Sequence, residues 1–170
     1  MFISSYEQHQ SFEDVLLSMD AIMVTGGNTL NMLAIWKAQG IDKILRDAWE
    51  RGIILSGGSA GSLCWFEQGT TDSRPQKVTT INCLGLLKGS HCPHYDSEPT
   101  RRPLYHGYIR SGEFKAGYAC DDRAAILFHD QKPEKVVSLD DTSNAYYVYL
   151  ENDVVVEKRL DKTVLKSTAD

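Results

Sequence analysis

The stretch from Ile53 to Trp65 constrains the fold of this chain more than any other. It opens with a short apolar run at 53–55, which predicts a buried strand, and continues into a G-x-S-x-G pattern at 57–61. Apolar residues then recur at helical spacing. A glycine-flanked serine between a strand and a helix predicts a nucleophile elbow, because a sharp turn through small residues lifts the hydroxyl above the sheet. The alternative is a glycine-rich turn that happens to contain Ser59, and the flanking elements favour the elbow.

The segments before this stretch alternate between helical and extended patterns. Helices are predicted at about 12–19, 30–39 and 41–49, and a short buried strand at 21–24. This order predicts an α/β fold in which a mainly parallel sheet is flanked by helices. Loops at the carboxyl ends of parallel strands share one edge of a sheet, so Gly26 and Gly27 are expected to face Ser59.

The second half of the chain is expected to be richer in strands. Residues 67–82 are mostly polar and predict a long loop that contains Asp72. A strand is predicted near 86–92, with His94 just beyond its end, and a helix within 98–111. Short β-rich runs follow after Gly117, at 124–128, 136–139, 145–150 and 154–158, and residues 151–153 predict a hairpin turn between the last two runs.

Composition excludes several classes of function. The net charge is −5 and 24% of the residues are charged, so the chain lacks the basic surface of a nucleic-acid-binding protein. No apolar run is long enough to span a membrane and no signal peptide opens the chain, so a cytoplasmic location is the expectation. The four cysteines form no C-x-x-C pair and are expected to be free thiols.

A nucleophilic serine requires a base, an orienting acid and donors for an oxyanion. The chain offers five histidines as the base: His9, His91, His94, His106 and His129. His94 is favoured because it follows a predicted strand, and His91 comes second. The candidate acids are Asp72, Asp96, Asp121 and Asp122. Composition and spacing alone do not decide among these histidines and acids, and the N–H groups of Gly27 and Ala60 are the candidate oxyanion donors.

Several residues around Pro93 have side chains that can bind metals: His91, Cys92, His94, Asp96 and His106. Their spacing matches no standard zinc pattern, so neither a metal site nor a cofactor is expected. Cys64 could be proposed as a nucleophile, but it lies one helical turn past Ser59 on an apolar helix and is expected to be a core residue.

The dipeptidase E and cyanophycinase family of serine peptidases resembles this chain in four motifs, which occur in the same order: Val24-Thr25-Gly26-Gly27-Asn28-Thr29, Gly57-Gly58-Ser59-Ala60-Gly61, Thr71-Asp72 and Cys92-Pro93-His94-Tyr95. The resemblance runs from about residue 20 to residue 96 and continues more weakly through 117–128. It implies a flavodoxin-like α/β sandwich, similar to the class I glutamine amidotransferases, with a strained serine elbow.

The resemblance also implies roles for individual residues. Ser59 would be the nucleophile, His94 the base and Asp72 the third member of the triad. Gly27 and Ala60 would supply the N–H groups of the oxyanion hole. The chain order of serine, acid and histidine also agrees with the elbow.

Substrate-binding residues follow from the same resemblance. Asn28 of the first motif would contact the substrate. Family members that prefer an N-terminal aspartate use an arginine after the catalytic histidine, and Arg101 or Arg102 could do so here by bidentate pairing. A solvated pair of arginines on a helix is the equal alternative.

The N-terminus departs from the family pattern. Only about 20 residues precede the first motif, whereas family members usually have one or more further strand–helix units there. We expect residues 1–170 to be a single α/β hydrolytic domain that is short at its N-terminus, or an incomplete sequence. A missing strand would leave a sheet edge that a partner subunit could cover, which is compatible with a homodimer.

The residues and the resemblance together predict a serine peptidase that cleaves small peptides. The expected form is a dipeptidase, with a preference for N-terminal Asp if an arginine binds the carboxylate. Its expected partner is a small peptide substrate, with no nucleic acid, membrane or cofactor. Two alternatives stay open: a non-catalytic binding or scaffold domain of the same fold, and an esterase or amidase on the same elbow.

Overall fold

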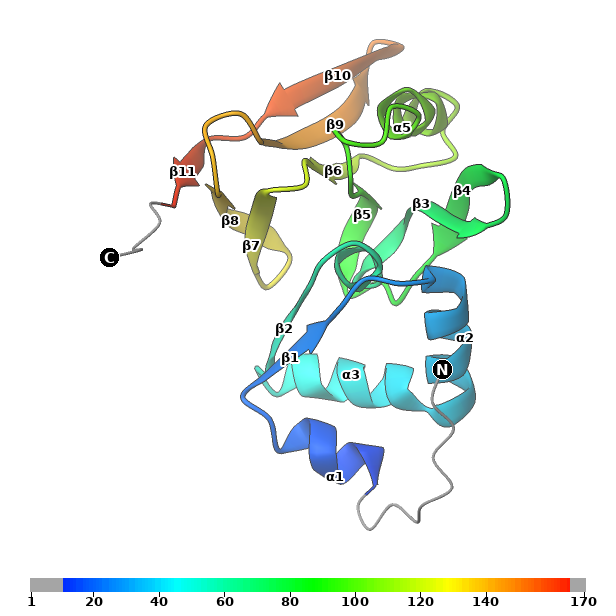
Figure 1. Cartoon of the computed structure of the whole chain (residues 1–170), viewed down its shortest axis with the longest axis vertical. Helices are drawn as coiled ribbons and strands as arrows, with labels where there is room; N and C mark the ends of the chain where they lie inside the picture. The colour runs from blue at the N-terminus through cyan, green and yellow to red at the C-terminus, as the bar shows by residue number, and fades with distance from the viewer. Residues whose placement is uncertain (1–10, 166–170) are drawn as a thin grey trace.

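The N-terminal part of the molecule consists of helices around a small sheet, and the C-terminal part is built mainly from strands (Figure 1). The computed structural model describes residues 11–165. The first part contains α1 (Phe12–Leu17), β1 (Ala21–Val24), α2 (Thr29–Gln39), α3 (Ile41–Glu50), β2 (Ile54–Gly57) and α4 (Ala60–Leu63). The architecture is mixed α/β, with sheets flanked by helices and a β-rich C-terminal part, as predicted. None of the helices within 11–165 is long and apolar enough to cross a membrane.

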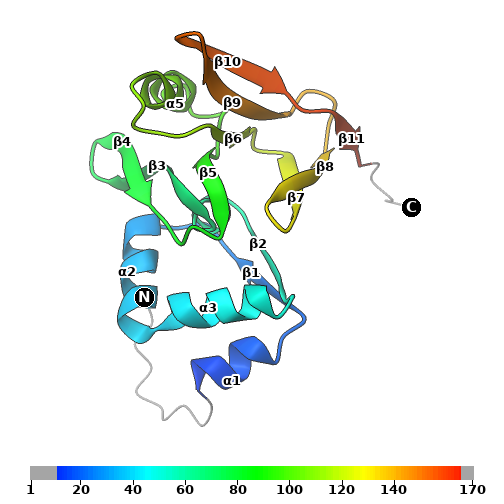
Figure 2. The same cartoon turned by 180° about the vertical axis from the view of Figure 1, so that it is seen from behind.

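β1 and β2 form a parallel two-stranded sheet in which Val24 lies opposite Gly57. Leu45 of α3 is buried in a cluster with Trp65 and is surrounded by part-buried apolar side chains of β1, β2 and α2. α1 packs against α3, at the end of the molecule far from the C-terminal strands (Figure 2). Gly40 ends α2 with a left-handed φ of 74°, and α3 begins at the next residue. The helices and the strand predicted before the elbow are therefore confirmed.

The largest sheet has the strand order β10-β9-β6-β5-β3-β4. Its strands are β3 (Phe66–Arg74), β4 (Lys77–Asn82), β5 (Leu87–Cys92), β6 (Gly117–Cys120), β9 (Ala145–Glu151) and β10 (Val154–Arg159). β3, β5 and β6 run parallel, whereas the outer strands pair antiparallel. α5 (Arg101–Arg110) packs against this sheet, where its Tyr105 and Ile109 join a buried cluster with Cys92, Ala119 and Val148.

Residues 67–82 form most of a β-hairpin, so the prediction of a long polar loop is wrong. β3 and β4 pair Thr70 with Thr80 and Thr71 with Thr79. Threonine is polar, which lowers the apolar content of the segment, but it is β-branched and fits a strand. Thr70 and Thr71 are in fact buried, at 0% and 2% exposure.

The β-rich runs predicted at the C-terminal end are confirmed. β7 (Ala124–His129), β8 (Lys132–Ser138) and β11 (Lys162–Val164) form a third sheet. The predicted turn joins β9 to β10, with Asn152 and Asp153 at φ values of 49° and 62°. Two successive residues at positive φ are what a tight two-residue hairpin requires.

The small N-terminal sheet and the largest sheet are separate among the described residues, because no strand pairing joins them. The connection between them is α4, a helix of four residues that contacts β1, β2 and β3. Residues at the end of β2 and residues at the end of β5 therefore belong to different sheets.

Candidate active site

Ser59 lies in a strained turn between β2 and α4. Its φ of 58° and ψ of −120° fall in a region that residues with side chains rarely adopt. Holding a residue there costs about 1–3 kcal/mol, so the surrounding structure must enforce it. The turn from strand to helix predicted around this serine is present.

The glycines of the G-x-S-x-G pattern allow two backbone segments to touch. A Cβ atom on Gly57 would lie 2.4 Å from the carbonyl oxygen of Val24, and one on Gly61 would lie 2.0 Å from the same oxygen. Neither position has room for a side chain, and glycine is therefore required at both. The end of β1 is consequently held against the elbow, which places Gly26 beside Ser59.

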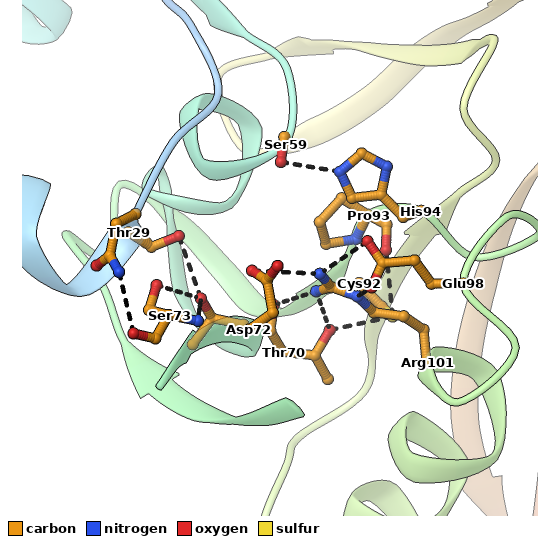
Figure 3. A network of polar contacts seen from close by, with 12 residues as sticks. Thr29, Ser59, Thr70, Asp72, Ser73, Cys92, Pro93, His94, Glu98 and Arg101 are labelled. Atoms are coloured by element: carbon orange, nitrogen blue, oxygen red, sulfur yellow. Dashed lines mark hydrogen bonds and ion pairs between the residues drawn. The ribbon is translucent and has the colours of Figure 1, made fainter. Parts of the chain in front are cut away.

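His94 contacts Ser59 directly. Its Nε2 atom lies 2.8 Å from the Oγ atom of Ser59 (Figure 3). Pro93 fixes the end of β5, and His94 itself has a left-handed φ of 56°. The structure therefore brings together the serine and the histidine that the sequence favoured, and both lie in unfavourable backbone conformations.

Asp122 contacts the other nitrogen of His94, with 2.6 Å between Oδ1 and Nδ1. It follows β6, which runs parallel to β5, so the two residues leave the same edge of the sheet. Asp122 was one of the four acids that the residues alone left open. A carboxylate at Nδ1 holds the imidazole in the tautomer that leaves Nε2 free to accept a proton from the serine.

Asp72, which the resemblance implies as the third member, does not contact His94 in the structure, and the carboxylate at Nδ1 is that of Asp122. The Asp72 carboxylate is 69% exposed and lies 3.6 Å from the Nη2 atom of Arg101 (Figure 3). The physical reason is the β3–β4 hairpin, which carries Asp72 on the far side of β5 from β6.

The charge of Asp122 is stabilised by the site. Burial alone would raise the pKa of Asp122, but hydrogen bonds from His94 and Ser97 and the nearby charge of Arg101 hold the pKa below its ordinary value. The side chains of His94 and Asp122 are 29% and 43% exposed, so solvent reaches the pair. An ionised carboxylate is thus available to stabilise an imidazolium.

The other candidate acids support this loop without contacting His94. Asp96 accepts a hydrogen bond from the backbone N–H of Asp122 at 3.0 Å. Asp121 is buried, which raises its pKa, and it accepts a hydrogen bond from the backbone N–H of Asn144 at 2.7 Å. Both residues fix the backbone around Asp122.

The remaining histidines lie in other environments. His91 is buried and contacts Ser62 at 3.0 Å. His106 lies 3.1 Å from Glu157 and 2.7 Å from Tyr95, and His129 is exposed. His9 lies outside the described residues.

The backbone N–H groups of Ala60 and Gly27 are the candidates for an oxyanion hole. Ala60 begins α4, and Gly27 follows β1, the strand that neighbours the serine-bearing strand β2. In the part of the chain that the structure describes, neither N–H donates to a backbone carbonyl. Free donors of this kind suit a developing negative charge.

Asn28 has a structural use in the fold. Its side-chain oxygen accepts a hydrogen bond from the backbone N–H of Asn31 and so caps α2, while its amide nitrogen donates to the carbonyl oxygen of Ser73 at 3.0 Å. The residue holds the loop of Gly27 against β3. Its expected contact with substrate stays a prediction.

Arg101 and Arg102 are both engaged in pairs. Arg101 is 2% exposed, and its guanidinium donates to Glu98 at 2.7 Å and to the carbonyl oxygen of Thr70 at 2.9 Å. Arg102 forms a bidentate pair with Glu157. Neither guanidinium is therefore free to bind a substrate carboxylate near Ser59. The alternative of a solvated pair of arginines also fails for Arg101, because Arg101 is buried.

A cavity of about 660 Å³ opens beside Ser59 and His94. Most of its lining is apolar: Trp49, Ile53, Leu55, Trp65, Phe66, Leu86, Leu87, Ile126 and Phe128. Three acidic residues also line its wall: Asp121, Asp122 and Asp130. A concave, mainly apolar site with a few polar groups is typical of small-molecule binding.

Comparisons with known proteins identify relatives of this chain. The model of peptidase family S51 matches residues 3–136. The uncharacterized peptidase YgaJ of Bacillus subtilis (strain 168) is 45% identical over 142 residues, which cover 84% of this chain and 61% of the relative. The uncharacterized peptidase Lin0382 of Listeria innocua is 28% identical over 122 residues, covering 66% of this chain and 57% of the relative.

A solved structure of a Listeria monocytogenes EGD-e protein, described as a candidate peptidase E, aligns with a TM-score of 0.47 and 22% identity over 88% of this chain and 64% of that one. The chain therefore spans about three fifths of the length of these three proteins. The family match confirms the resemblance that four short motifs predicted, and the chain belongs to peptidase family S51.

Proposed function

We propose that the protein is a serine peptidase that cleaves small peptides, as a dipeptidase. The observation that carries this proposal is the continuous contact from Ser59 through His94 to Asp122, at 2.8 Å and 2.6 Å, on a strained turn. Three residues in this arrangement have the geometry of a nucleophile, a general base and an orienting acid. Family membership supports the same class of reaction.

In the proposed reaction, Ser59 Oγ attacks the carbonyl carbon of the scissile bond as His94 Nε2 takes the hydroxyl proton. The tetrahedral oxyanion accepts hydrogen bonds from the N–H groups of Gly27 and Ala60. His94 then gives the proton to the leaving amine, and an acyl-enzyme remains on Ser59. Water, activated by His94, hydrolyses the ester, while Asp122 stabilises each imidazolium.

The cavity bears on which peptides are cleaved. Its volume of about 660 Å³ lies in the range of small-ligand sites. Its acidic wall residues would repel an aspartate side chain, and both arginines that could bind one are already paired. We therefore expect a preference for uncharged, apolar residues over the N-terminal Asp preference that the resemblance implies.

The test is hydrolysis of a dipeptide panel that includes Leu-Xaa, Phe-Xaa, Asp-Xaa and Glu-Xaa, by the wild type and by Ser59→Ala. The wild type should cleave, and the variant should lose about 10³- to 10⁶-fold in kcat. Asp72→Asn, which changes an acid outside the proposed triad, is the matched control and should keep its activity.

Other outcomes would favour the alternatives. Turnover of esters without turnover of peptides would indicate an esterase. A folded wild type that binds peptides equally well with and without Ser59, and cleaves none, would indicate a binding domain. Near-normal turnover by Ser59→Ala would exclude the mechanism.

A further inference from the structure

A second serine–histidine pair lies directly behind the first. The Oγ atom of Ser62 is 3.0 Å from the Nε2 atom of His91. Ser62 comes one turn of helix after Ser59, and His91 comes three residues before His94. Both pairs therefore join the segment of α4 to the segment of β5. The pair of Ser59 and His94 lies at the mouth of the site, and the pair of Ser62 and His91 lies in its interior.

The direction of the hydrogen bonds in the inner pair follows from its neighbours. The Nδ1 atom of His91 lies 3.0 Å from the carbonyl oxygen of Tyr118, which can only accept, so Nδ1 carries the proton. Nε2 is then an acceptor, and the hydroxyl of Ser62 donates to it. The carbonyl oxygen of Ser59, 2.9 Å from the same hydroxyl, already accepts from the backbone N–H groups of Ser62 and Leu63.

His91 is held rigidly. Its ring is 3% exposed and stacks on Phe66, with the ring centroids 4.7 Å apart and the planes at 12°. Burial lowers the pKa of His91 to about 4, so the ring is neutral near pH 7 and keeps the tautomer described above. A fixed ring makes a hydrogen bond to it a reliable constraint on distance.

The constraint adds a side-chain contact to backbone contacts that already tie these segments, in which the N–H groups of Leu84 and Leu87 donate to the carbonyl oxygens of Cys64 and Trp65. Ser59 follows β2 in the small sheet and His94 follows β5 in the large sheet, and no strand pairing connects these sheets in residues 11–165 (Figure 1). The Ser62–His91 hydrogen bond runs from α4 to β5, and Tyr118 continues it to β6. It joins the two segments three residues away from each catalytic residue, whereas the backbone contacts of Cys64 and Trp65 lie five and six residues past Ser59.

We propose that Ser62 and His91 are positioning residues that hold Ser59 Oγ and His94 Nε2 within reach of each other. The inference rests on the proposed serine-peptidase function. The inner pair itself lacks what catalysis would need, because its histidine is buried and its Nδ1 partner is a backbone carbonyl in place of a carboxylate.

The experiment compares Ser62→Ala with Ser62→Thr and with Ser138→Ala. Thr keeps the hydroxyl, and Ser62 lines the cavity. Ser138 is the matched control: it is a buried serine whose hydroxyl donates to the carbonyl oxygen of Asp140 at 2.7 Å, on β8. All three variants are first checked for folding by circular dichroism.

Ser62→Ala should lose about 10- to 100-fold in kcat with KM within threefold of the wild type, because small misplacements of reacting atoms have effects of this size. The rate at which a fluorophosphonate labels Ser59 should fall in parallel. Ser62→Thr should recover most of both rates, and Ser138→Ala should retain them. Equal behaviour of Ser62→Ala and Ser138→Ala, or no recovery in Ser62→Thr, would overturn the proposal.

A crystal structure of Ser62→Ala separates this proposal from the proposed function. The distance from Ser59 Oγ to His94 Nε2 should exceed 3.5 Å (a limit for hydrogen bonding) in Ser62→Ala and stay near 2.8 Å in Ser138→Ala, whether or not the wild type cleaves peptides. An unchanged distance in Ser62→Ala would refute the positioning role even if the protein proves to be an active peptidase.

Discussion

Two serine–histidine pairs lie three residues apart on the same pair of segments, yet their surroundings differ in every respect that matters for chemistry. The outer pair of Ser59 and His94 reaches solvent, and both residues have positive φ values. The inner pair of Ser62 and His91 is part of a regular helix and a regular strand. Identical side chains at nearly identical distances therefore do not make identical sites.

The third partner separates the two pairs most clearly. His94 Nδ1 contacts the carboxylate of Asp122, whereas His91 Nδ1 contacts the carbonyl of Tyr118. A carboxylate stabilises a protonated ring, and a carbonyl in a buried site fixes the tautomer of a neutral one. The comparison indicates that the partner on the far nitrogen decides whether a histidine can act as a base.

After the loss expected for Ser59→Ala, the largest effect is expected from removing that carboxylate. Asp122→Asn should lose about 10³- to 10⁴-fold in kcat, because an amide can stabilise the wrong tautomer of His94 and cannot stabilise its charged form. Steady-state kinetics on the preferred dipeptide measure the loss. Asp72→Asn serves as the control and should stay within threefold of the wild type. A larger loss in Asp72→Asn than in Asp122→Asn would restore Asp72 as the third member.

The next effect is expected at Gly61, which lies between Ser59 and Ser62, and it concerns the stability of the fold. A Cβ atom at Gly61 would lie 2.0 Å from the backbone of Val24, so Gly61→Ala should lower the free energy of unfolding by about 3 kcal/mol or more. Gly58→Ala is the control, since a Cβ atom there meets no atom within 4 Å. Urea denaturation of both variants checks this difference, and equal stabilities would show that β1 does not lie against the elbow.

The inner histidine should leave a signature in the pH dependence of stability. His91 has a folded pKa of about 4, below the 6.5 of a free histidine, so the unfolded chain binds more protons between these values. The contribution of His91 to the free energy of unfolding is therefore fully present above pH 6.5. It is lost as the pH falls towards 4, by up to about 3 kcal/mol.

Urea denaturation at pH 7 and pH 4.5 measures this loss. His91→Asn keeps a donor for the Tyr118 carbonyl but cannot titrate, so its stability should change less between the two values. An equal change in the variant and the wild type would assign the pH dependence to other groups.

The smallest effect is expected at Arg102, which resemblance links to substrate and the structure links to Glu157. Arg102→Gln should alter the ratio of kcat/KM for Asp-Xaa and Leu-Xaa by less than threefold. A selective loss of Asp-Xaa cleavage would show that Arg102 leaves Glu157 to bind the substrate. The outer pair of Ser59 and His94 would then have a cationic side chain nearby.

Local pattern was enough to predict most of the elements, with residues 67–82 as the exception, and to favour the outer pair. The apolar run before Ser59 and the glycines around it specify the turn, and Pro93 specifies the end of the strand before His94. These features depend on residues that are neighbours in the sequence, so they can be predicted from one sequence alone.

Asp122 could not be chosen from sequence alone because its contact depends on long-range pairing. It lies 28 residues beyond His94, and only the parallel pairing of β5 with β6 brings the two together. The signal that could have found it is an acid placed directly after the short strand that begins at Gly117. The inner pair was missed for a similar reason: the helical spacing of Ser62 from Ser59 was visible, but the separation of the two sheets was not.

The separation of the two sheets has a consequence for motion. Because the hydrogen bond between Ser59 and His94 crosses from one sheet to the other, the distance between these side chains depends on how the two sheets pack. We therefore expect a ligand that occupies the cavity between β2 and β7, which Ser59 and His94 line, to change the distance between these two side chains.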